Sequence, residues 1–250
     1  MAISLASLQT SSTLRPPRIL MHGVHGVGKT TFAAGADAPV VIMTEDGLGM
    51  LKVPHFPLAT SYADVVEALD ALLNEEHAHS TVVIDSVDWL EPLVWAETCR
   101  RNGWASIEAP GFGKGYAEAL TVWREYLDRL NTLRDRRGMA VVQIAHTDIK
   151  RFDSPEHEPY DRYVIKLQAR AAALLQEHCD VVLFANYRMS ITKADVGFNK
   201  KVARALGSGE RVLHTAERPA FLAKNRYGLP DTLPLDWKAF VAAMPQPEQP

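Results

Sequence analysis

A glycine-rich octapeptide near the start of the chain has the residue types of a phosphate-binding loop. Residues 23–30 read GVHGVGKT and match G-x-x-x-x-G-K-[ST] at every fixed position. The glycines allow a tight turn whose N–H groups face inward, and the helix that opens there adds a positive dipole end. We therefore expect the phosphates of ATP to be bound by Gly23, Val24, His25, Gly26, Val27, Gly28, Lys29, Thr30 and Thr31.

Two side chains of this loop have separate tasks. Lys29 is expected to reach the outer phosphates, and the Thr30 hydroxyl to ligate Mg²⁺. Packing is the simpler role for His25. The alternative for the whole motif is a glycine-rich turn with an incidental Lys-Thr pair. The motif, however, follows an apolar run at 18–21 and opens a helix, which is the context it requires.

Two acidic residues follow runs that we expect to form buried strands ending at the same edge of a sheet. Asp85 follows TVVI at 81–84 and is placed to hold Mg²⁺ through water opposite Thr30, unless it caps the next helix. Glu45 follows PVVIM at 39–43 and is placed to orient and deprotonate the attacking water. The alternatives to Glu45 are Asp46 as the base, or a purely structural turn acid.

A histidine follows a third apolar run. His146 comes directly after MAVVQIA at 139–145, so its side chain belongs to the same edge. It is either a sensor of the γ-phosphate or a loop histidine bonded to the backbone, and the residues do not separate these roles.

Strands that alternate with helices must position these side chains. Apolar runs predict strands at 18–21, 39–44, 81–84, 139–145 and 180–186. Helical spacing and composition predict helices at 61–77, 89–101, 116–137 and 161–178, with long loops at 102–115 and 147–159. The pattern predicts an α/β fold with a mainly parallel, doubly wound sheet. Further along we expect antiparallel edge strands at 187–193, 211–215 and 220–224, then a helix at 237–244.

The composition is that of an ordinary globular chain. Of 250 residues, 47% are hydrophobic and 23% are charged, which excludes disorder as the main state. The two cysteines are far apart and form no CxxC pair, which disfavours a disulfide scaffold. No apolar run approaches the roughly 18 residues of a membrane helix. We expect a cytoplasmic protein with one domain at 18–244 between flexible tails at 1–17 and 245–250.

The net charge of −3 argues against binding to nucleic acid by charge alone. The charge is uneven, because residues 186–226 hold nine Lys or Arg and three acids. This segment is either a solvated basic face or a surface for a polyanion.

Together these features resemble the RecA-like branch of P-loop ATPases. The order is the phosphate loop, followed by strands that end in Glu45, Asp85 and His146. The Lys-x-Arg within AKNRYGLP at 223–230 is similar to the element that RecA-like recombinases and hexameric helicases insert into a neighbouring subunit's nucleotide site. The resemblance implies that Lys224 and Arg226 stabilise transition-state charge in trans, with a solvated strand end as the alternative.

Over about residues 16–244 the chain is similar to the phage-encoded Sak4-like group of RecA-core ATPases, which is associated with single-strand annealing and recombination. The similarity rests on a short first helix, GFGKGY at 111–116 and KNRYGLP at 224–230. It implies a Mg²⁺-dependent, DNA-stimulated ATPase in the host cell cytoplasm. It also implies a homo-oligomer with composite ATP sites on single-stranded DNA, and a single-strand DNA-binding protein as a partner.

In RecA-like proteins two loops after core strands face DNA, and the corresponding stretches here are 102–115 and 147–160. The resemblance implies base stacking on aromatic residues and backbone contacts by cations. The candidates are Phe112, Lys114, Tyr116, Lys150 and Arg151. Alternatively the aromatic residues hold the first loop against the core. The second stretch carries several acids after Lys150 and Arg151 and is not a basic groove.

Two other functions remain open from the sequence. A P-loop small-molecule kinase would need an acceptor pocket and an arginine-rich lid, for which RDRR at 134–137 is the candidate cluster. A recombination mediator would use ATP as a switch without hydrolysing it, and Glu45 argues against that function.

Overall fold

The structure is a computed structural model that describes residues 4–8, 14–156, 158–195 and 201–245, and for residues 6, 189–195 and 201–208 it describes the backbone alone. The strands are β1 Arg18–Gly23, β2 Pro39–Met43, β3 Thr81–Asp85, β4 Ala140–Phe152, β5 Tyr160–Ile165, β6 Val181–Asp195, β7 Lys201–His214, β8 Lys224–Asn225 and β9 Thr232–Pro234. The helices are η1 Leu5–Ser7, α1 Lys29–Ala34, α2 Tyr62–Asn74, α3 Val87–Asn102, α4 Lys114–Arg137, α5 Ala169–His178 and α6 Trp237–Ala243.

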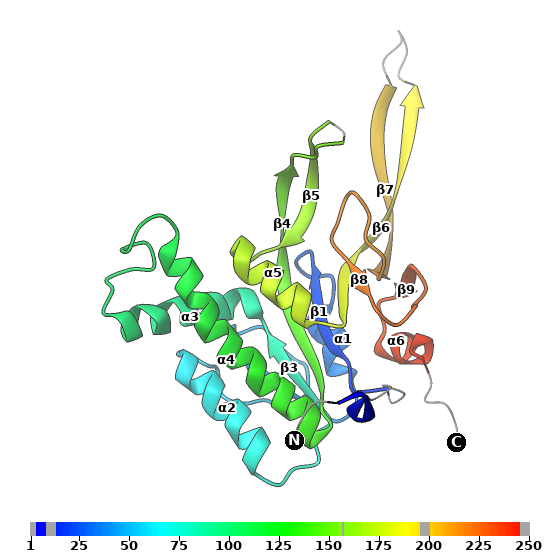
Figure 1. The fold of residues 1–250 in the computed structure, drawn as a ribbon. Coiled ribbons are helices and arrows are strands. Elements are labelled where there is room, and N and C mark those ends of the chain that lie inside the picture. The colour runs from blue at the N-terminus through cyan, green and yellow to red at the C-terminus, as the bar shows by residue number, and fades with distance from the viewer. Residues whose placement is uncertain (1–3, 9–13, 157, 196–200, 246–250) are drawn as a thin grey trace.

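In the described residues the strands form one mixed sheet (Figure 1). Its order is β2-β3-β4-β1-β6-β7-β9, with β5 paired to β4 and β8 paired to β6. The central strands β2, β3, β4, β1 and β6 are parallel to their neighbours, whereas β5, β7, β8 and β9 are added antiparallel. The predicted architecture is therefore confirmed: an α/β fold with a mainly parallel sheet and antiparallel strands toward its C-terminal edge.

The central strands send alternate side chains into two apolar clusters. In β1, Leu20 joins the cluster made with α2, α3, α4 and α5, while Ile19 and Met21 join the cluster made with α1 and α6. Both faces of the sheet are therefore buried. This burial explains why the strands read as continuous apolar runs rather than as alternating polar and apolar residues.

The first helix has the short length expected from the sequence, and α4 is the long helix predicted at 116–137. α1 has six residues, which agrees with the short first helix expected from the sequence. α4 has 24 residues and a left-handed glycine at each end, Gly113 and Gly138. In the part of the chain that is described, no helix combines the length and apolarity needed to cross a bilayer.

The prediction for residues 147–178 is wrong in two respects. β4 continues through the expected loop to Phe152 and forms an antiparallel hairpin with β5, and the expected helix begins only at Ala169. The distal part of the hairpin lies outside the core, where Ile149 is 62% exposed. Its residues therefore lack the apolar run that marks a buried strand.

The prediction for the antiparallel region is also corrected. The backbone of β6 continues to Asp195 and pairs with β7, so the separate strand expected at 187–193 is an extension of β6. Residues 220–224 form isolated bridges at Phe221 and then the short strand β8. The β4–β5 and β6–β7 hairpins both project from the sheet edge at which β1 and β3 end (Figure 1).

An ion cluster around Asp180 joins the beginnings of β1 and β6 to α4. Asp180 is buried and accepts hydrogen bonds from the backbone and guanidinium of Arg18, at the start of β1. Arg134 of α4 lies 3.2 Å from the same carboxylate and donates to the carbonyl of Pro16. Burial raises the pKa of Asp180, but the hydrogen bonds from Arg18 outweigh it, so the pKa is lowered.

Replacing Asp180 with Ala is expected to reduce the free energy of unfolding by about 3 kcal/mol, because the buried Arg134 and the partly buried Arg18 lose their counter-charge. Urea denaturation at neutral pH measures the change. The matched control is Asp135→Ala, which removes the half-exposed partner of Arg15 and should cost less than about 1 kcal/mol. Equal effects of the two substitutions would show that the cluster does not stabilise the fold.

Candidate functional site

The phosphate loop connects β1 to α1 at the carboxyl edge of the sheet. Gly23 packs so closely on β6 that a Cβ atom there would lie 2.3 Å from the carbonyl oxygen of Ala185. Gly28 has φ 104°, a left-handed conformation that favours glycine, and is the N-cap of α1. Val27 is fully buried and anchors the loop. The first N–H groups of α1 have no partner within the helix, which suits them to bind phosphate oxygens.

Lys29 lies against this loop. Its side chain is buried, and Nζ donates to the carbonyl oxygens of Gly23 at 3.0 Å and Val24 at 3.1 Å. Burial lowers the pKa of Lys29, while the nearby carboxylate of Asp85 opposes the shift. Lys29, Thr30 and Thr31 line a pocket of about 350 Å³ at the carboxyl edge. The pocket therefore brings together the cation and the loop that the motif predicts.

Thr30 and Asp85 meet in the same pocket. The hydroxyl of Thr30 donates to Oδ2 of Asp85 at 2.7 Å, and burial raises the pKa of this carboxyl. The N-cap position of α3 belongs to Ser86, so Asp85 is not that helix's N-cap residue. A carboxylate beside a hydroxyl fits Mg²⁺, which takes few protein oxygens and completes its shell with phosphates and water. In the described residues no group of three or more His, Cys, Asp or Glu could hold a metal.

Glu45 lines the same pocket as the loop. Its Oε2 accepts a hydrogen bond from the Ser86 hydroxyl at 3.2 Å and lies 3.7 Å from Nδ1 of His146. The side chain is 22% exposed, so solvent reaches it. Glu45 lines the pocket together with Lys29 and Asp85, whereas Asp46, the alternative base, is not among its lining residues.

His146 is bonded to a carboxylate. Its Nδ1 lies 2.9 Å from Oδ2 of Asp88, and its backbone N–H donates to Oδ1 at 2.9 Å. Burial raises the pKa of Asp88, but these hydrogen bonds outweigh it and lower the pKa. The His146 ring stacks on His25 of the phosphate loop, with ring centroids 4.4 Å apart, and His146 lowers the pKa of His25. The side chain of His146 is thus held at the pocket by Asp88.

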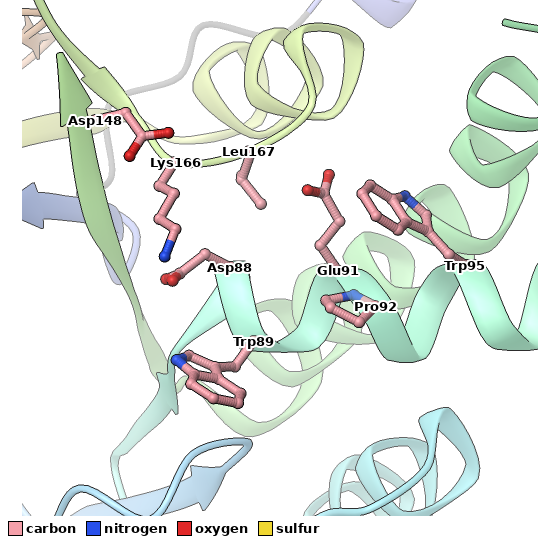
Figure 2. A pocket seen from close by; sticks show the side chains of 8 residues that line it. All are labelled: Asp88, Trp89, Glu91, Pro92, Trp95, Asp148, Lys166 and Leu167. Atoms are coloured by element: carbon pink, nitrogen blue, oxygen red, sulfur yellow. The ribbon is translucent and has the colours of Figure 1, made fainter. Parts of the chain in front are cut away.

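A second cavity of about 390 Å³ lies on the other side of Asp88 (Figure 2). Glu91 and Trp95 of α3 line it, and Lys166 extends toward Asp88. Glu91 is buried, and both of its carboxylate oxygens lie within 3.1 Å of the backbone nitrogen of Gln168, the N-cap residue of α5. Burial raises the pKa of Glu91 to about 7.

The Lys-x-Arg pair lies away from the pocket in its own chain. β8 pairs with the first residues of β6, at the edge opposite the phosphate loop. Lys224 Nζ donates to the carbonyl oxygens of Gln176, Glu177 and Cys179 at the end of α5. Arg226 is 54% exposed and lies 3.7 Å from Asp180. Lys224 therefore binds within its own chain, and Arg226 is the more accessible cation of the pair.

The candidate DNA-contacting residues fall on two separate segments. In the α3–α4 loop Phe112 is fully exposed, whereas Tyr116 donates to Glu108 and packs edge-on against Trp95. Lys114 begins α4 and is exposed. Lys150 and Arg151 lie on the exposed part of β4 in the β4–β5 hairpin rather than in a loop. Tyr116 thus holds its loop in place, while Phe112 remains accessible.

Three residues that contact the site were not singled out from the sequence. Asp88 positions His146. The sequence signal for it is a second acid three residues after Asp85, in the first turn of a helix. Tyr187 and Arg211 contact the phosphate loop from β6 and β7. Their positions depend on strand pairing, and no local pattern marks them.

Comparisons with known proteins found one matching family model and a similar solved structure. A family model described as an AAA domain matches residues 15–227. The search of curated proteins found no match. Among solved structures, one described as the RadB recombinase aligns with a TM-score of 0.45 and 16% identity, over 84% of this chain and 86% of that chain.

Replacing Glu91 with Gln is expected to flatten the pH dependence of stability. The pKa of Glu91 rises from 4.5 to about 7 on folding, so between these values the folded chain keeps a proton that the unfolded chain has lost. The stability contribution is present below pH 4.5 and lost as pH rises through 7, by at most about 1.4 kcal/mol per pH unit. Urea denaturation from pH 4.5 to 8 measures it. Parallel curves for wild type and variant would contradict the assignment.

Proposed function

The chain belongs to the AAA domain family, and we propose that it is a Mg²⁺-dependent ATPase that assembles on single-stranded DNA in phage recombination, annealing or replication. The observation that supports hydrolysis is the convergence of Lys29, Thr30, Asp85 and Glu45 on one pocket. It supplies the cation, the metal-binding oxygens and the base that phosphoryl transfer to water requires.

Each residue has one task in the proposed reaction. The loop amides and Lys29 bind the phosphates. Thr30 and Asp85 would hold Mg²⁺, which neutralises charge on the phosphate oxygens when it is bound. Glu45 orients a water molecule and accepts its proton, and the Ser86 hydroxyl holds the Glu45 carboxylate in place. His146 is held in place by Asp88, and its Nδ1 lies 3.7 Å from the Glu45 carboxylate. In this proposal His146 senses the outermost phosphate.

Lys29→Ala is expected to abolish ATP hydrolysis while the far-ultraviolet circular dichroism stays that of the wild type. Glu45→Gln should bind ATP within a few-fold of the wild type but hydrolyse it roughly 10²- to 10⁴-fold more slowly, because only the base is lost. Steady-state phosphate release and equilibrium binding separate the two effects. Asp46→Asn is the matched control. If that substitution, and not Glu45→Gln, abolishes turnover, then Asp46 is the base.

DNA binding is the finer part of the proposal. Two observations support it: Phe112 is fully exposed in the α3–α4 loop two residues before Lys114, and the β4–β5 hairpin carries Lys150 and Arg151 outside the core. An accessible ring next to a cation suits stacking of a base together with contact to its phosphate. The family resemblance adds the single-strand DNA-binding protein as a partner.

Assembly would complete the site with a cation from a neighbouring subunit. Arg226 is half exposed at the sheet edge remote from its own phosphate loop, so it can act only on another subunit's nucleotide. Lys224 is bound to three carbonyl oxygens and more readily supports Arg226 than inserts itself. The proposed trans cation is therefore Arg226.

Turnover per subunit is expected to rise with protein concentration and with added single-stranded DNA, because both promote assembly. Arg226→Ala should retain ATP binding and lose turnover. A mixture of Arg226→Ala and Glu45→Gln chains should regain part of it, since some interfaces combine an intact Glu45 with an intact Arg226. Turnover that is unaffected by DNA and protein concentration, with no recovery on mixing, would contradict the assembly proposal.

The structure offers little support for a small-molecule kinase. The candidate lid, residues 134–137, lies at the end of α4, next to the start of β4 and remote from the phosphate loop. Its first arginine, Arg134, is buried against Asp180 and the carbonyl of Pro16. Residues 134–137 cannot close over a bound nucleotide unless Arg134 gives up its contacts with Asp180 and Pro16.

A further inference from the structure

Tyr187 and Arg211 form a cross-strand pair at the base of the β6–β7 hairpin. The two residues are register partners, and the pairing of β6 with β7 shifts between Tyr187 and Met189. Below this irregularity the strands belong to the sheet, and beyond it they project as a two-stranded ribbon (Figure 1). The pair therefore lies where the ribbon leaves the body of the protein.

Both side chains of the pair bind the phosphate loop. The Tyr187 hydroxyl donates to the carbonyl oxygen of Gly26 at 3.2 Å, and Arg211 Nη1 donates to that of Val27 at 3.4 Å. A Cβ atom built on Gly28 would lie 2.7 Å from Nη1 of Arg211. The guanidinium therefore lies against the residue that caps α1, next to the amides that receive phosphate oxygens.

The charge of Arg211 is not matched by an acid in the described residues. Its neighbour Arg188 pairs with Glu210 at 3.1 Å, but no carboxylate of the described chain lies within ion-pair distance of Arg211. A guanidinium has five N–H donors and stays charged, and one long bond to a carbonyl leaves most of them available. Phosphate oxygens are the partners for which this planar group is best suited.

We propose that Arg211 is a phosphate-binding residue that acts in cis, on the nucleoside di- or triphosphate bound by its own loop, with Tyr187 as a positioning residue. The proposal rests on the proposed function, because it assumes that the loop binds a nucleotide. It adds a second cation to Lys29, supplied by β7 of the same chain. Arg211 is distinct from Arg226, which lies near Asp180, where the parallel strands begin.

Equilibrium binding of ATP, ADP and inorganic triphosphate to the full chain tests the assignment. Arg211→Gln should weaken binding of all three by at least tenfold, and Arg211→Lys should recover part of the loss. Tyr187→Phe should weaken binding by less than about threefold, since it removes a contact to the loop and no charge. Arg124→Gln, an exposed arginine on α4, controls for the loss of one positive charge.

Each result separates one explanation from another. If Arg211→Gln weakens ATP but not inorganic triphosphate, the guanidinium contacts the base or ribose and the proposal is overturned. If Tyr187→Phe costs as much as Arg211→Gln, both residues only hold the loop and the proposal is overturned. Normal binding by Arg211→Gln overturns this inference alone, whereas a wild-type chain that binds none of the three probes overturns the proposed function as well.

Mixing distinguishes action in cis from action in trans. Chains with Arg211→Gln and chains with Glu45→Gln should not restore each other's ATP hydrolysis, because every site would lack one of the two residues. Recovery on mixing would show that Arg211 serves a neighbouring subunit, which would overturn the assignment in cis. Arg226→Ala mixed with Glu45→Gln in the same assay shows whether composite sites form at all.

Discussion

The hydrogen bond between Thr30 and Asp85 spans two strands that are not neighbours. β4 lies between β1 and β3, so Thr30 must be carried across it by the first turn of α1. The loop that leads to α1 begins at Gly23, which packs against the carbonyl of Ala185 with no room for a side chain. The position of Thr30 beside Asp85 thus depends on the close contact between β1 and β6.

The segment 85–88, which follows β3, organises the rest of the pocket. Asp85 receives the Thr30 hydroxyl, Ser86 donates to Glu45 and Asp88 holds both the backbone and the ring of His146. The Thr44 hydroxyl closes the arrangement by donating to the carbonyl of Ser86. One short segment therefore binds side chains from the ends of β2 and β4 and from α1. A shift of β3 along the sheet would disturb the contacts of Thr30, Glu45 and His146 together.

The sequence was sufficient for the parts of the fold where local pattern and burial agree. The phosphate loop fixes its own conformation through its glycines, and strands buried on both faces appear as apolar runs, so the central sheet and the edge with Glu45, Asp85 and His146 could be predicted. The β4–β5 hairpin could not, because a ribbon outside the core carries Lys150 and Arg151 as readily as any loop does. The contacts of Asp88 and Arg211 could not be predicted either, since each depends on a partner more than fifty residues away.

Helix α5 is held at its two ends by side chains of opposite charge. The carboxylate of Glu91 meets the backbone N–H of its N-cap residue, and the ammonium of Lys224 meets the carbonyl oxygens of its last turn. The ammonium of Lys224 complements the helix dipole, and so does the Glu91 carboxylate once it ionises above about pH 7. The helix therefore connects α3, which carries Asp88, to β8, which ends one residue before Arg226. The ten-residue α5 thus links the segment beside the pocket to the strand that carries Lys224.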